Sequence, residues 1–190
     1  VWEVPEDSPH FKPGYVQHTV NWPVPSDVYA GSFMYHMQPN KVLLGYVVGL
    51  DYKNPYLNPY EEFQRLKTHP DIRKVLEDGE CISYGARVLN EGGYHAIPKL
   101  TFPGGMLAGC SAGFLNVAKI KGSHNAMKTG MLAAESVFKS IDDLEGKNLE
   151  DYERSVHDSW VAKELKESRN FKSGFEKGLW AGLAHGGLVT

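Results

Sequence analysis

The first half of the chain has the hydrophobic pattern of paired strands. Residues 32–37 and 41–50 are two runs rich in apolar and aromatic side chains, separated by the turn sequence Gln38-Pro39-Asn40. This arrangement predicts a β-hairpin. The second run is apolar almost throughout, which indicates a strand covered on both faces. Residues 15–22 are rich in β-branched and aromatic residues and predict a further strand.

Two short helices are expected after the hairpin. Asn58-Pro59 is typical of a helix start, because proline suits the first helical position and asparagine can cap it. A second helix is expected over residues 70–76, which also begins with proline. Residues 81–89 are then expected to form a strand that leads into a turn rich in glycine.

Helical periodicity dominates the second half. A strand and loop over residues 100–110 are expected to precede a helix over residues 123–141, which Ser123 can cap. The apolar stripe of this helix consists of Ala126, Met127, Gly130, Met131, Ala134, Val137, Phe138 and Ile141. A last amphipathic helix ending near Asn170 is marked by Leu149, Tyr152, Val156, Trp160 and Leu165. The fold class is α+β, with an antiparallel sheet in the first half.

Composition and spacing narrow the function. The chain has 190 residues and a net charge of −3, which gives no electrostatic basis for binding nucleic acid. Its eight histidines are scattered singly, so we expect no metal site. Cys81 and Cys110 lack a C-x-x-C spacing, which favours a reducing compartment. We identify no Ser/His/Asp arrangement or carboxylate pair and therefore name no catalytic residue.

The junction before the expected helix at residues 123–141 has the character of a flavin site. An apolar strand is followed by a loop punctuated with glycine, and the first turn of the helix is small and polar. Backbone N–H groups and the positive end of the helix dipole can meet the negative charge that a flavin gains on reduction. The alternative is an ordinary capped helix in a protein core.

Six ordered blocks of sequence carry a resemblance to a known family. They are residues 22–23, 29–36, 45–57, 84–93, 97–105 and 104–135, and weaker similarity continues through Ser159-Trp160 and Arg169-Asn170. The chain resembles the electron-transfer flavoprotein–ubiquinone oxidoreductases. The resemblance implies an enzyme that passes electrons from reduced electron-transfer flavoprotein to ubiquinone through FAD and a [4Fe–4S] cluster, on a protein that contacts one membrane surface.

The resemblance also implies that this chain is the middle of such an enzyme. The dinucleotide motif G-x-G-x-x-G and the cluster cysteines would lie on the remaining segments of the protein. Residues 1–100 would form the ubiquinone-binding domain, with an antiparallel quinone-binding sheet. Residues 101–145 would form the returning strand-loop-helix part of a glutathione-reductase-like FAD domain, and residues 146–190 a helix and the start of a membrane-contacting segment. The expected location is the matrix side of the mitochondrial inner membrane, or a bacterial cytoplasmic membrane.

The family pattern assigns quinone contacts to two residues. A Tyr-Gly-Gly-Ser-Phe segment of the family matches Tyr29 to Phe33, which places Ala30 and Gly31 at the two glycines. A backbone without Cβ lets a quinone ring come close. Ala30 departs from the pattern, which is costly only if its φ angle must be positive. The alternative is that both residues simply begin a hairpin strand.

The same comparison suggests the FAD contacts. Gly109 and Ser111 would approach the ribityl and diphosphate part, with Gly122, Ser123 and Met127 beside the flavin ring. Asn90 is a polar neighbour of the flavin or only a support for its own turn. Lys119 and Lys121 could stabilise a flavin anion, although we expect them to be solvated loop residues.

Two other functions stay open at this stage. One is a related flavin-dependent reductase with another acceptor, and the other is a non-catalytic structural or split subunit of a larger membrane assembly. Residues 174–190 resemble the start of the family's second membrane-contacting segment, and the alternative is a buried tail of a soluble domain.

Overall fold

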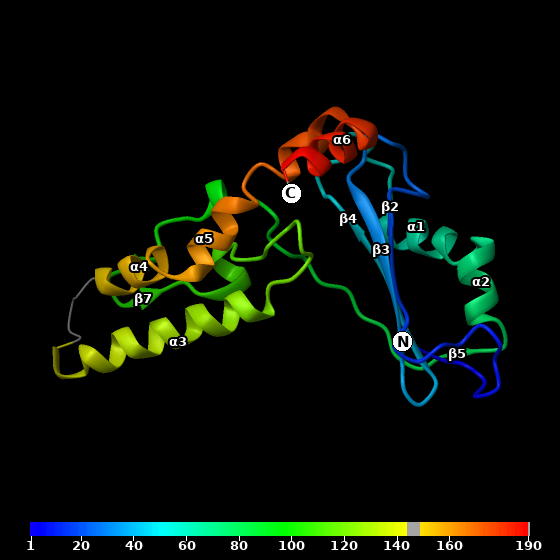
Figure 1. The fold of residues 1–190 in the computed structure, drawn as a ribbon, viewed down its shortest axis with the longest axis horizontal. Coiled ribbons are helices and arrows are strands. Elements are labelled where there is room, and N and C mark those ends of the chain that lie inside the picture. The colour runs from blue at the N-terminus through cyan, green and yellow to red at the C-terminus, as the bar shows by residue number, and fades with distance from the viewer. Residues whose placement is uncertain (144–148, 190) are drawn as a thin grey trace. The chain divides into compact units, whose positions relative to one another are not determined.

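The computed structural model describes residues 1–143 and 149–189, which fold into two compact units (Figure 1). The first unit comprises Val1–Ala86 together with Phe175–Ala181. The second comprises Arg87–Gly174 and the residues from Gly182 onward. Strands and helices occur in both, so the predicted α+β class is confirmed. The expected division at residues 100 and 145 stays a prediction, and its second boundary lies outside the described residues.

A five-stranded antiparallel sheet forms the centre of the first unit. Its strand order is β2 (Val16–Val20), β3 (Ala30–Met37), β4 (Lys41–Val48), β1 (Trp2–Glu3) and β5 (Glu80–Cys81). Strands β3 and β4 are the predicted hairpin, with Met37 paired to Lys41 beside the turn. The predicted strand at residues 15–22 is β2, which pairs with β3.

Two helices cover one face of this sheet (Figure 1). They are α1 (Pro59–Leu66) and α2 (Pro70–Leu76), where the sequence predicts them. The Asn58 side chain accepts a hydrogen bond from the Tyr60 N–H group, and His69 Nδ1 accepts one from the Asp71 N–H group. The buried core between the sheet and the helices consists of Val4, Met34, Val42, Leu44, Leu66, Ile72, Val75 and Leu76.

The opposite face of the sheet is only partly covered by the described residues. Leu43 and Val47 on β4 are half-buried there, so the expectation that this strand is covered on both faces is met only in part by the described residues. Phe33 lies across the position where Gly45 has no side chain, and its ring stacks on that of Tyr35 with centroids 5.1 Å apart. An aromatic surface therefore forms over the middle of the hairpin.

The strand expected over residues 81–89 is wrong apart from its first residue. Strand β5 ends at Cys81, and residues 82–93 form neither helix nor strand. The physical reason is that its partner β1 is only two residues long, so no ladder is available for the residues that follow.

A bundle of helices on a small hairpin forms the second unit. Strands β6 (Thr101–Phe102) and β7 (Gly105–Met106) meet at a turn where Gly104 has φ +84°. The helices are α3 (Ser123–Lys139), α4 (Glu150–His157) and α5 (Trp160–Glu167). A further helix, α6 (Leu179–Val189), has its first residues in the first unit and its remaining ones in the second. The core consists of Leu100, Ala112, Phe114, Leu132, Tyr152, Val156, Val161 and Leu165.

Four short 3₁₀ helices complete the described structure: η1 (Tyr94–Ala96), η2 (Gly109–Ala112), η3 (Ile141–Asp143) and η4 (Lys172–Lys177). The single long helix expected up to Asn170 is wrong, because the chain divides it into α4 and α5. Ser159 lies at the break in extended conformation, and its Oγ accepts a hydrogen bond from the Val161 N–H group at 3.2 Å. A local N-cap thus starts a new helix where apolar periodicity suggested continuity. None of the described helices is both long and apolar enough to cross a membrane.

The large side chains of the predicted apolar stripe of α3 do not face the described core. Met127, Met131 and Phe138 are 71%, 55% and 75% exposed. The buried face instead carries Asn125, Thr129, Leu132 and Ser136. An apolar row on the surface and a largely polar row in the interior reverse the usual arrangement of an amphipathic helix.

Candidate functional site

The loop of η2 lies against the start of α3. Gly109 has φ +64°, a conformation that favours glycine, and its N–H group donates a hydrogen bond to Thr129 Oγ1 at 3.0 Å. A Cβ atom at Gly109 would lie 3.2 Å from the Ala126 Cβ. Glycine at this position therefore lets the loop approach the first two turns of the helix.

Three other predicted flavin residues lie around the same loop. Asn90 Nδ2 donates to the Cys110 carbonyl at 3.3 Å and so connects the irregular residues 87–93 to η2. Ser111 is exposed on η2. A Cβ atom at Gly122 would lie 3.5 Å from Cys110 Sγ. The structure therefore brings together Asn90, Gly109, Ser111 and Gly122, which the sequence separates by 32 positions.

The N-terminus of α3 has no side-chain cap among the described residues. Gly122 is the N-cap residue, and Ser123 is already the first helical residue, so the expectation that Ser123 caps this helix is wrong. The backbone N–H groups of the first turn are thus left without a side-chain acceptor. Ser123 is exposed, and the exposed Met127 lies one turn further along.

Asn125 lies in the first turn of α3 and is fully buried. Its Nδ2 group donates to the Phe114 carbonyl at 2.9 Å and to Glu164 at 3.4 Å. Its Oδ1 atom is buried and has no hydrogen-bond partner among the described residues. Buried acceptors in folded proteins are nearly always paired, so this orphan atom marks the helix start as a place where a partner is missing.

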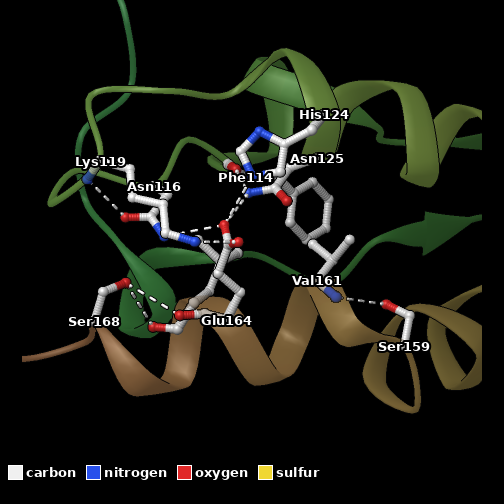
Figure 2. Close-up of polar contacts among 10 residues, drawn as sticks. Phe114, Asn116, Lys119, His124, Asn125, Ser159, Val161, Glu164 and Ser168 are labelled. Atoms are coloured by element: carbon white, nitrogen blue, oxygen red, sulfur yellow. Dashed lines mark hydrogen bonds and ion pairs between the residues drawn. The ribbon is translucent and has the colours of Figure 1, made fainter.

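Glu164 on α5 is the centre of a polar cluster at this helix start (Figure 2). Its carboxylate accepts hydrogen bonds from Lys119 Nζ at 2.7 Å, His124 Nε2 at 2.9 Å and Asn116 Nδ2 at 3.0 Å. Partial burial on its own would raise the pKa of Glu164. The hydrogen bonds from Lys119, Asn116 and His124 outweigh that effect and lower the pKa to about 2.

The loop formed by residues 116–121 supplies two members of this cluster. Its ends pair through the backbone, with Asn116 N–H to the Lys121 carbonyl at 2.9 Å and Lys121 N–H to the Asn116 carbonyl at 3.2 Å. Asn116 Oδ1 also accepts the Lys119 N–H group at 3.1 Å. Ile120 has φ +55°, which is a strained conformation for a β-branched residue.

Lys119 is exposed, as expected of a loop lysine, and its ammonium group also forms an ion pair with Glu164. Lys121 Nζ donates to the Ile120 carbonyl at 3.3 Å. The ring of His124 stacks on Trp160 with centroids 5.8 Å apart and an interplanar angle of 4°. This stack adds a second link between α3 and α5.

The two predicted quinone residues lie in the first unit, at the start of β3. Ala30 pairs with Val48, and its carbonyl accepts the Asn21 N–H group at 2.8 Å. Ala30 is not among the residues with positive φ, so alanine in place of the family's glycine is a mild change. A Cβ atom at Gly31 would lie 2.6 Å from the Thr19 carbonyl oxygen, so the sheet itself requires glycine there.

The loop beside Ala30 is organised by Asn21, which is buried and has φ +66°. Its Nδ2 group donates to the carbonyls of Pro25 at 2.9 Å, Val24 at 3.2 Å and Val28 at 3.3 Å. Tyr46 Oη donates to the Asn21 carbonyl at 2.6 Å, and burial raises the pKa of Tyr46 to about 12. This network fixes the backbone that precedes β3.

Comparison with known proteins identifies the chain. Residues 1–89 match the family described as ETF-QO, ubiquinone-binding. Mitochondrial electron transfer flavoprotein-ubiquinone oxidoreductase from Caenorhabditis elegans is 52% identical over 197 residues, which cover 99% of this chain and 33% of the relative. The Arabidopsis thaliana protein of that name is 56% identical, covering 97% and 28%, and the human one 52% identical, covering 96% and 31%. The chain belongs to the electron transfer flavoprotein–ubiquinone oxidoreductase family.

The predicted resemblance is thus confirmed. The chain spans about a third of the length of the oxidoreductases that it matches. Ala30 and Gly31 lie inside the matched ubiquinone-binding region, whereas the six residues predicted for FAD lie beyond residue 89. Among the described residues, no three or more His, Cys, Asp or Glu side chains gather as metal ligands would.

Sequence reasoning missed the polar cluster around Glu164. His124, Lys119 and Asn116 lie 40, 45 and 48 positions before Glu164 in the sequence, so no local spacing reveals the cluster. One signal was available on α3, where Asn125, Thr129, Leu132 and Ser136 recur at helical spacing on the side opposite to the apolar stripe. Two competing faces on one helix indicate that it packs on both sides.

Proposed function

We propose that this chain is the central segment of a membrane-associated oxidoreductase that passes electrons from reduced electron-transfer flavoprotein to ubiquinone. The observation that carries this proposal is the 52% identity to oxidoreductases of that name over 96–99% of the chain. FAD and a [4Fe–4S] cluster would carry the electrons. The dinucleotide-binding motif and the cluster ligands are proposed to lie on the remaining segments of the enzyme.

The ubiquinone site is proposed at Ala30 and Gly31. The match of residues 1–89 to a ubiquinone-binding family supports this assignment. The network around Asn21 and the pairing of Gly31 with Val20 and Val47 would hold these two residues rigid.

FAD is proposed to bind along the loop of η2 and the start of α3. When bound, FAD would accept electrons and release them one at a time toward ubiquinone. Asn90, Gly109 and Ser111 would lie by its ribityl and diphosphate part, and Gly122, Ser123 and Met127 by its ring. Three observations favour a fit: the helix start lacks a side-chain cap, Asn125 Oδ1 lacks a partner among the described residues, and Met127 is exposed.

The exposed apolar row of α3 is proposed to contact the remaining segments of the same enzyme. Beyond Met127, which is assigned to the flavin, the row consists of Met131, Ala134 and Phe138, which lie on one side of the helix at spacings of three and four residues. A contiguous exposed apolar row on a protein surface usually marks an interface. The matching relatives are about three times as long as this chain, which supplies enough sequence to cover it.

The proposed location is the matrix side of the mitochondrial inner membrane, because the matching relatives are named as mitochondrial. A bacterial cytoplasmic membrane is the alternative. Helix α6 carries the exposed Trp180 and Leu188 and has no Lys, Arg, Asp or Glu, which suits contact with a membrane surface.

The cofactors of the full-length protein test this proposal. We expect native mass spectrometry in mild detergent to find FAD and an iron–sulfur cluster on the polypeptide that contains these residues. Full-length protein that holds neither group after cofactor reconstitution would contradict the proposal. Such a result would favour a structural subunit.

A further inference from the structure

Glu164 connects three segments that meet at the start of α3. Its carboxylate bonds to the loop 116–121 through Asn116 and Lys119, and to the first turn of α3 through His124 (Figure 2). Only 17% of the Glu164 side chain is exposed. Charge-assisted hydrogen bonds of this kind are roughly twice as strong as neutral ones. One residue on α5 therefore fixes both flanks of Gly122 and Ser123.

The conformation of the loop 116–121 is strained, so contacts from outside the loop help to stabilise it. Ile120 lies in the left-handed region, which is a strained conformation for a β-branched residue. The strained turn directly precedes Gly122, the N-cap of α3. Glu164 adds the contacts from α5 to bonds that lie within the loop, such as the backbone pairing of Asn116 with Lys121, the bond of Ile120 N–H to the Val117 carbonyl and the local bond of Asn116 Oδ1.

Charge at this place also matters for a flavin. Glu164 is anionic and lies beside the cation Lys119, and the positive end of the α3 dipole adds to the local field. Reduction of a flavin adds negative charge, so nearby cations favour reduction and nearby anions oppose it. The balance between Glu164 and Lys119 therefore acts on the charge of whatever binds at Gly122 and Ser123.

We propose that Glu164 is a positioning residue for the flavin: it holds the loop 116–121 and the start of α3 in place and, together with Lys119, sets the charge that the flavin meets. This inference rests on the proposed FAD site at Gly122, Ser123 and Met127. Glu164 acts through its partners and is not assigned any contact with the cofactor.

Two opposite charge changes test the proposal in the full-length holoenzyme. Glu164→Gln removes a negative charge and keeps the shape of the side chain, so the midpoint potential of FAD is expected to become more positive. Lys119→Gln removes a positive charge from the same ion pair, so the potential is expected to become more negative. Both variants break one ion pair and would affect stability in the same direction, whereas the expected potentials move in opposite directions.

The control is Glu167→Gln, on the exposed surface of the same helix. It makes the same chemical change away from the cluster and should leave the potential at the wild-type value. One contrary result is a midpoint potential of FAD that shifts in the same direction in both FAD-loaded variants, Glu164→Gln and Lys119→Gln, and another is a potential that shifts in neither. Either result would overturn the inference and would leave the proposed function intact. If Glu164→Gln does not fold, Lys119→Gln decides alone. Full-length wild-type protein that binds no FAD would overturn both.

Discussion

The backbone N–H group of Gly109 donates a hydrogen bond to the hydroxyl group of Thr129, 3.0 Å away, inside the second unit. The same hydroxyl donates to the Asn125 carbonyl at 2.8 Å. Thr129 therefore connects the loop of η2 to the polar face of α3. Because the hydroxyl is fully buried, neither of its partners can turn to water instead.

Replacing Thr129 by valine is expected to destabilise the full-length protein. Valine keeps the shape but leaves the buried Gly109 N–H group without an acceptor, which costs about 1–3 kcal/mol. The midpoint of thermal unfolding, followed by circular dichroism, measures the loss. The control Thr129→Ser keeps the hydroxyl and should lose clearly less. Equal stability of the valine variant and the wild type would show that this bond is unimportant.

Substitution at Gly31 is expected to lower stability and quinone reduction, whereas substitution at Ala30 is expected to change them little. Gly31→Ala would place a methyl group 2.6 Å from the Thr19 carbonyl oxygen, and since that atom belongs to the neighbouring strand, relief requires a shift of β2. We expect a loss of about 1–3 kcal/mol and weakened quinone reduction. Ala30→Gly restores the family's glycine pair and should cost no more than about 1 kcal/mol while keeping quinone reduction.

Unfolding and quinone reduction should be measured on both variants. Gly31→Ala protein as stable and as active as the wild type would mean that β2 does not lie as described. Loss of quinone reduction in a stable Ala30→Gly variant would mean that the alanine is needed at this site.

Acid should weaken the connection between α3 and α5. The pKa of Glu164 is lowered from 4.5 to about 2 in the folded protein. A carboxylate with a depressed pKa stabilises the fold fully above about pH 4.5 and loses this contribution as the pH falls toward 2. Since Glu164 is largely buried, the contribution is on the order of 3 kcal/mol.

The comparison of wild type and Glu164→Gln by thermal unfolding between pH 2 and pH 7 measures this contribution. The two midpoints should differ most near neutral pH and converge in acid. A difference that is constant over this range would contradict the ionic role of Glu164.

The exposed row on α3 should behave as an interface in the full-length protein. We expect the double variant Met131→Gln, Phe138→Ser to lose about 2–5 kcal/mol of stability there, because both side chains would leave a buried contact. The control Lys139→Gln changes an exposed residue at the edge of the row and should stay within about 0.5 kcal/mol. A double variant with wild-type stability would mean that solvent, not another segment, covers this row.

Local signals predicted some elements well. Helices α1 and α2 begin at Pro59 and Pro70 as expected, because a proline at the first position and a capping side chain directly before it act within one turn. The β3–β4 hairpin was equally accessible, since its turn and its two runs are adjacent in sequence.

Long-range contacts explain what the sequence did not reveal. The end of β5 at Cys81 depends on the two-residue length of β1, which lies about 80 positions earlier in the chain. The Glu164 cluster joins residues 40 to 48 positions apart. The exposed side of α3 could not be predicted either, because periodicity identifies an apolar face without saying which part of the protein covers it. Ser159 is the exception, since a serine before an apolar run is a readable helix start.

Electron transfer by the full-length protein tests the central claim most directly. The measurement is reduction of a soluble ubiquinone analogue with reduced electron-transfer flavoprotein as the donor, followed by absorbance under anaerobic conditions. We predict turnover that requires the donor, the quinone and bound FAD. Fully FAD-loaded protein that accepts no electrons from electron-transfer flavoprotein, or passes none to the quinone, would contradict the account.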